Sequence, residues 1–172
     1  MDSVSVVIVL RIVHVLTGVF WVGGTFLVAF FIIPTVKSTG PIGGQFAGAL
    51  MGKARLAPWL TVGGILSVVS GLLLYWDLYA NAPWSTFGPH TLFGIGGVLA
   101  VIAFIAGAAI GPATSSRMAA LGARIAGQGT PPTPQQITER EALLNRLSAL
   151  ARFNATVLGL AVACMAAARY VS

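Results

Sequence analysis

Charged residues are scarce in this chain of 172 residues. They make up 8% of the sequence, ten basic and four acidic, whereas soluble globular domains carry about 25%. Apolar residues account for 56%, and the mean hydropathy is +0.89. So few charged side chains cannot cover a surface that faces water. The composition excludes an ordinary soluble domain and indicates an integral membrane protein, with the lipid bilayer as its first partner.

Other absences narrow the function. The single cysteine, Cys164, cannot form an intramolecular disulfide and matches no zinc or redox spacing. The glycine pairs at 23–24 and 96–97 lie inside apolar runs, so no phosphate-binding loop is expected. No carboxylate lies inside an apolar run, which leaves a proton relay without residues. The net charge of +6 comes from basic residues spread over loops and helix ends, so nucleic acid is not expected as a partner.

Four uncharged or nearly uncharged runs are long enough to cross a bilayer, which takes about 20 residues. We expect spans at about 12–34, 56–76, 90–111 and 150–170. The chain starts without the basic region of a cleaved signal peptide, so the first span is expected to be retained. Residues 1–172 then form a single membrane domain. The predicted fold class is all-α, a four-span transmembrane helix bundle running up-down-up-down.

The connection between spans three and four, about 115–149, predicts a helical hairpin that extends both spans. Thr133, Pro134 and Gln136 form a capping box with proline at the first helical position, which predicts a helix from about Pro134 to Tyr170. A hinge is expected at 127–132, where glycine and proline gather. Apolar residues recur at helical spacing on both sides of this hinge. They are Met118, Leu121, Ile125, Leu143, Leu144, Leu147 and Leu150.

Basic residues predict the orientation. Eight of the ten lie in the first and third connections, and the positive-inside rule places those connections in the cytoplasm, with both termini outside. The helical hairpin is then cytoplasmic. The eight are Lys37, Lys53, Arg55, Arg117, Arg124, Arg140, Arg146 and Arg152, and the other two are Arg11 and Arg169.

Small residues predict where the helices approach closely. Span two has Gly63, Ser67 and Gly71 at four-residue spacing, and span three has Gly107 and Gly111. Helix association in lipid depends on close packing at such residues. They indicate contact and carry no chemistry of their own.

The chain has two histidines, His14 and His90, and both are predicted in the outer half of the bundle at similar depth. Ionisable residues inside a membrane are functional candidates by default. Arg11, His14, Gly18 and Trp21 follow one face of the first span. If the first and third spans lie diagonally across the core, the two imidazoles can face one cofactor.

Three interpretations of these residues stay open. In the first, His14 and His90 are axial ligands of a b-type haem, Gly18 leaves room for the porphyrin, and Arg11 and Arg169 pair with its propionates. In the second, the histidines bind copper together with Met165, because Cu(I) favours soft sulfur with imidazole.

The third interpretation is structural and needs no cofactor. His14 then hydrogen-bonds a neighbouring helix, and His90 is an interfacial residue with its ring in water. The two arginines anchor the helix ends, with Asp77 as a partner for one of them or as a solvated loop residue. Trp21 is then lipid- or core-packed.

The stretch 10–24, LRIVHVLTGVFWVGG, has a tryptophan seven residues after its histidine and then a small pair. It resembles the first helix of CopD-type copper-resistance membrane domains and of uncharacterised bacterial four-helix relatives, and more distantly of HemJ-type protoporphyrinogen oxidases. Phe87–His90 and Met165–Tyr170 also resemble the four-helix relatives. The HemJ-type proline-arginine pattern is absent, because 25–33 is uncharged.

The resemblance implies a small bundle in the bacterial inner membrane, with His14 at the family histidine and haem or copper nearby. We therefore expect a redox-associated membrane protein that exchanges electrons with a membrane or periplasmic partner. The alternative is a non-catalytic subunit or scaffold of a larger complex or homo-oligomer, in which the hairpin docks a partner. Whether the chain is an enzyme is left open by the sequence, as are its substrate and oligomeric state.

Overall fold

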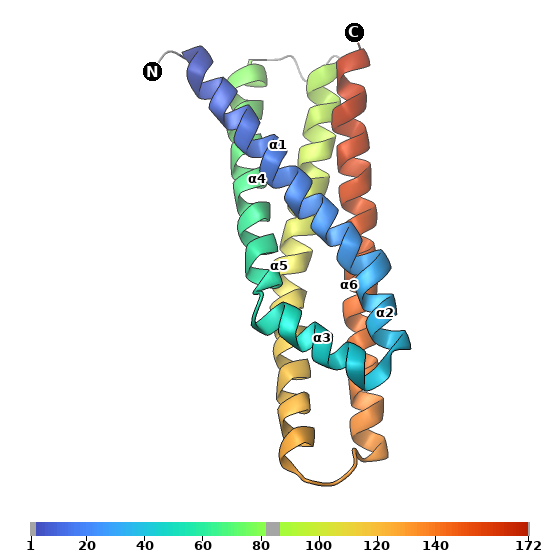
Figure 1. The fold of residues 1–172 in the computed structure, drawn as a ribbon. Helices are drawn as coiled ribbons and strands as arrows, with labels where there is room; N and C mark the ends of the chain where they lie inside the picture. Colours follow the sequence, from blue (N-terminus) through green and yellow to red (C-terminus); the bar gives the residue numbers. More distant parts are fainter. Residues whose placement is uncertain (1–2, 82–86, 172) are drawn as a thin grey trace.

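A computed structural model describes residues 3–81 and 87–171, and these ranges are helical with short connections and no strand. Four helical stretches are long and apolar enough to cross a membrane: 4–38, 56–79, 89–127 and 134–170. The ends of the described chain lie at the same end of the bundle (Figure 1). The elements are α1 (Ser3–Leu27), the π-helical turn η1 (Val28–Ile32), α2 (Ile33–Ser38), α3 (Gly40–Gly52), α4 (Leu56–Tyr79), α5 (Pro89–Gly127), α6 (Pro134–Ala167) and the 3₁₀ turn η2 (Ala168–Tyr170).

The all-α class and the four long apolar helices are confirmed, but the helices are longer than the predicted spans. Helix α1 starts at Ser3 instead of near residue 12, and Arg11 lies inside it. A charged residue limits how far a segment can enter hydrocarbon, but it does not end the helix. The predicted boundaries therefore marked the apolar stretches and missed the helix ends.

The first long helix contains a π-helical turn just before Pro34. An α-helical proline has no N–H to donate, and its ring crowds the carbonyl four residues earlier. Pro34 follows the five-residue π turn η1, after which the N–H of Ile33 donates to the carbonyl of Val28. The wider turn accommodates the proline without ending the helix, in the manner of other π segments.

Helix α3 was not expected from the sequence, where 37–55 was read only as a connection. It contains five glycines and no charged residue, so neither propensity nor an amphipathic pattern indicates it. It runs across the bundle between α2 and the start of α4 (Figure 1). Ile42 is 75% exposed and Phe46 54% exposed, so the helix presents apolar side chains on its outer surface.

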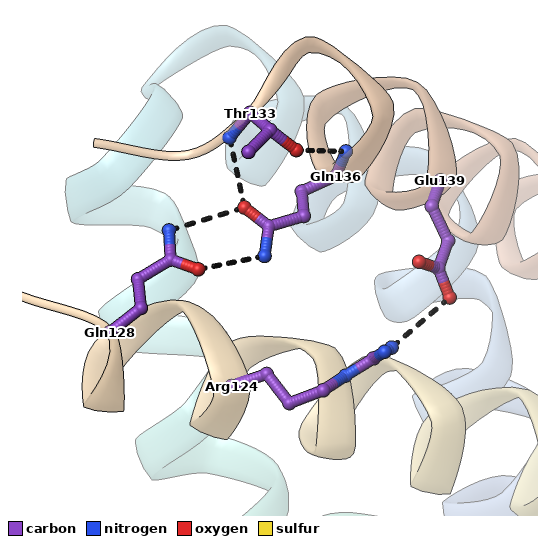
Figure 2. Close-up of polar contacts among 5 residues, drawn as sticks. All are labelled: Arg124, Gln128, Thr133, Gln136 and Glu139. Atoms are coloured by element: carbon purple, nitrogen blue, oxygen red, sulfur yellow. Dashed lines mark hydrogen bonds and ion pairs between the residues drawn. The ribbon is translucent and has the colours of Figure 1, made fainter. Parts of the chain in front are cut away.

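The predicted hairpin is present, with its α5 arm running on to Gly127 and its α6 arm starting at Pro134. We call residues 112–149 the stalk. The capping box forms as expected: the Thr133 hydroxyl accepts from the backbone N–H of Gln136, and the side-chain Oε1 of Gln136 accepts from the backbone N–H of Thr133 (Figure 2). Gln128 exchanges two hydrogen bonds with Gln136 across the hinge, at 3.2 and 2.9 Å.

Side chains between α5 and α6 close the stalk along its length. Leu121 is 1% exposed and Leu143 is 9% exposed, in agreement with the predicted apolar stripe. Arg124 and Glu139 add an exposed ion pair at 3.5 Å, which contributes little to stability on its own (Figure 2). The stalk is therefore a helical hairpin that is packed inside and polar outside.

In the apolar half of the bundle, the core is small and the outer surface is apolar. Trp21, Ala103 and Leu158 form its buried centre, joining α1, α5 and α6. Large side chains such as Val19, Val98 and Leu160 are more than half exposed. Such a surface suits lipid and would be costly in water.

Candidate functional site

The α1–α4 contact holds His14. Its Nδ1 lies 2.8 Å from the backbone carbonyl oxygen of Ser67, and the side chain is half-buried. Small residues make room for this contact. A Cβ on Gly71 would lie 2.7 Å from Cε1 of His14, and a Cβ on Gly18 would lie 3.3 Å from the Ser67 hydroxyl oxygen. The predicted close packing along Ser67 and Gly71 is therefore observed, with α1 as the neighbour.

The Ser67 contact defines the proton at one ring nitrogen of His14. A carbonyl oxygen can only accept, so Nδ1 must carry the hydrogen of this bond. In the neutral ring, Nε2 then keeps a free lone pair. Metal-binding histidines commonly have this arrangement, with the other ring N–H donated to a backbone carbonyl. The same bond also confirms the structural prediction that His14 hydrogen-bonds a neighbouring helix.

His90 lies in the first turn of α5, after Pro89, and is 7% exposed. Its ring centroid is 6.3 Å from that of Tyr79, and Tyr79 in turn stacks on Phe93 with centroids 5.8 Å apart. The expectation that the ring of His90 lies in water is wrong, because the side chain is buried. The aromatic ring of Tyr79 on α4 lies beside it.

The two histidines contact different turns of α4. His14 lies against Ser67 and Gly71, whereas His90 lies against Tyr79, eight residues beyond Gly71. Eight residues of α-helix correspond to about 12 Å along its axis. The two rings therefore contact α4 about two turns apart. A shared haem site for His14 and His90 stays a prediction.

The remaining candidate residues have identifiable neighbours. Trp21 is 8% exposed and packs edge-on against Phe104, with ring centroids 6.0 Å apart, so its surroundings are those of a core residue. The space beside Gly18 is taken by Ser67 of α4. Met165 packs against Gly96, where a Cβ would lie 2.8 Å from its Cγ.

Arg11 and Arg169 are exposed, Arg11 within α1 and Arg169 in the 3₁₀ turn η2. Arg11 lines an open groove of about 380 Å³ between α1 and α4, together with Asp77. The only ion pair among the described residues is the one in the stalk, so the two charges share this groove without joining. Arg11 is thus accessible to an anionic group, as a propionate contact requires.

Asn154 is a polar residue that the sequence analysis overlooked. It lies on α6 facing α5, where its Nδ2 would be 2.9 Å from a Cβ on Gly107. Its Oδ1 is buried and has no hydrogen-bond partner among the described residues. The signal in the sequence is an amide side chain within an apolar run, which has no titratable group. Gly107, predicted to lie at a helix contact, gives this amide its space.

The described residues hold no cluster of three or more histidine, cysteine, aspartate or glutamate side chains suited to a metal ion. A metal bound at His14 would therefore take its other ligands from elsewhere, such as methionine sulfur or a porphyrin. Comparisons with protein-family models, with the curated proteins and with the solved structures give no match.

The fit of His14 against Gly71 yields a stability prediction. Gly71→Ala places a methyl group against the imidazole, so we expect a loss of about 1–3 kcal/mol from overpacking. Gly23→Ala is the matched control, because a Cβ there meets nothing within 4 Å. The control should be neutral or slightly stabilising, since alanine is the better helix former. Thermal unfolding in detergent compares the two variants, and equal midpoints would show that the ring is not held against Gly71.

Proposed function

We propose that the chain is a redox-associated protein of the bacterial inner membrane, with His14 as a ligand of a b-type haem or of copper. The observation that carries the proposal is the Nδ1 contact of His14 with the Ser67 carbonyl, which orients the ring and leaves Nε2 for a metal. The position of His14 in an apolar helix adds support, because ionisable residues are costly there unless they have a role.

The proposed topology has four spans in up-down-up-down order, with the stalk in the cytoplasm and both termini outside. It rests on the excess of basic residues in the first and third connections. His14 then lies in the outer half of the membrane, where electrons pass to or from a membrane or periplasmic partner. Arg11 would pair with a haem propionate, since it lines an open groove one turn from His14.

The proposal predicts a cofactor that depends on His14. Protein extracted in mild detergent should show a Soret band with sharp reduced α and β bands, or else bind stoichiometric copper without these bands. His14→Ala should lose the cofactor, whereas Ser67→Ala should retain it, because the contact is to the backbone carbonyl. Optical spectra and metal analysis measure both. His90→Ala tests the shared site: it abolishes the haem spectrum only if both rings bind iron.

The absence of both metals, in membranes before extraction as well as in purified protein, would contradict the proposal. So would a cofactor that His14→Ala retains in full.

A second candidate function is a non-catalytic subunit whose stalk docks a partner. The specific observation in its favour is the construction of the stalk, with a packed leucine interior, a capped α6 and two pairs of side chains across the hinge (Figure 2). Such a hairpin keeps its shape outside the bundle and presents polar side chains to a partner.

Replacing residues 118–144 by a short glycine-serine loop tests the subunit function. Complex assembly, followed by native gel electrophoresis of membrane extracts, should be lost if the stalk docks a partner. The cofactor spectrum should survive, because His14 lies in the other half of the bundle. The matched control exchanges the exposed pair, Arg124→Glu with Glu139→Arg, which keeps the stalk and its net charge. Unchanged assembly without the stalk would rule the subunit function out.

A further inference from the structure

A groove between α5 and α6 lies near the base of the stalk, away from His14. Its volume is about 310 Å³, and it is open to the outside. Its lining is apolar except for a single guanidinium group. The lining residues are Ala106, Ile110, Arg146, Ala149, Leu150 and Phe153.

The charge lies at one end of this groove. Along α6, Phe153 lies at the end of the groove nearer the apolar half of the bundle, and Arg146 lies at the other end, within the stalk. Helix α5 carries no charged residue between Pro89 and Ser116, so the α5 side of the groove belongs to its apolar stretch. The groove thus runs from apolar surroundings towards a cation.

A second cationic side chain, Arg117, lies beyond the Arg146 end of the groove. Arg117 follows Ile110 by seven residues, two turns of α5, and therefore lies on the same face of the helix. Both Arg117 and Arg146 are exposed, and neither has a carboxylate within ion-pair distance among residues 3–81 and 87–171. Two guanidinium groups without an acidic partner present hydrogen-bond donors that suit a phosphate group.

We infer that this groove binds an anionic phospholipid, with an acyl chain between α5 and α6 and the phosphate on Arg146 and Arg117. The apolar lining, including Phe153 at 47% exposure, suits a hydrocarbon chain. The unpaired positive charge selects an anionic headgroup over a zwitterionic one, since basic pockets between membrane helices attract anionic lipids. The proposed lipid site lies on α5 and α6 at the base of the stalk, and it does not depend on a cofactor at His14.

Native mass spectrometry of the full chain with added phosphatidylglycerol or phosphatidylcholine of the same acyl chains tests the site. Phosphatidylglycerol should bind more tightly. Arg146→Gln should weaken its binding about fivefold, the effect of one basic residue near a lipid surface, and adding Arg117→Gln should weaken it further by a similar factor. Arg152→Gln is the matched control: it removes the same charge from the same helix but lies outside the groove, so affinity should stay within twofold.

Ala149→Phe tests the acyl-chain seat separately, because it fills the groove without changing any charge. It should weaken binding of phosphatidylglycerol at least fivefold, with folding checked by gel filtration and circular dichroism. Equal affinity for the two lipids would overturn the inference. It would also fail if Arg152→Gln matched Arg146→Gln, if Ala149→Phe had no effect, or if inorganic phosphate at millimolar concentration displaced the lipid.

Discussion

Backbone hydrogen bonding is the constraint on which the rest of the structure depends. Hydrocarbon offers no partner to an N–H or a carbonyl group, so a chain of this composition has to satisfy its backbone internally, and helices do so within one segment. The adjustments within the long helices follow the same rule. The π turn before Pro34 keeps the first helix continuous where a proline removes a donor. Threonine hydroxyls in the helices, such as those of Thr17 and Thr114, donate to carbonyls four residues earlier, so these hydroxyls have partners inside their own helix.

The same constraint explains how His14 is accommodated. A polar ring among apolar helices needs a partner and space, and α4 supplies both through the Ser67 carbonyl and the missing side chain of Gly71. That contact uses only one ring nitrogen. The other nitrogen, Nε2, distinguishes the two roles of His14. The proposed function requires that Nε2 binds a metal, whereas a purely structural histidine needs no ligand there. The stalk and the proposed lipid groove at its base lie on α5 and α6, away from His14, and are compatible with either role of His14.

The sequence predicted the features that depend on local pattern. Uncharged runs gave the four apolar helices, and Thr133 with Gln136 gave the start of α6. Contacts between segments that are distant in the sequence were not predicted. Helix α1 crosses the bundle diagonally (Figure 1), and His14 contacts α4 about two turns away from the turn that His90 contacts. The sequence did not predict helix α3, because its five glycines lower the helix propensity of the segment. His90 is buried with Tyr79 of another helix beside its ring, a relation that no local sequence pattern predicts.

The central claim is that the α1–α4 contact lies in hydrocarbon while the stalk lies in water. Site-directed spin labelling tests it most directly, with Cys164→Ser as background and single cysteines at exposed positions Val69 and Val98 of the bundle and Ala123 of the stalk. In lipid bilayers, labels at 69 and 98 should relax strongly with oxygen and weakly with a water-soluble nickel chelate, and the label at 123 should do the reverse. Nickel accessibility at 69 as high as at 123 would place α4 in water and contradict the account.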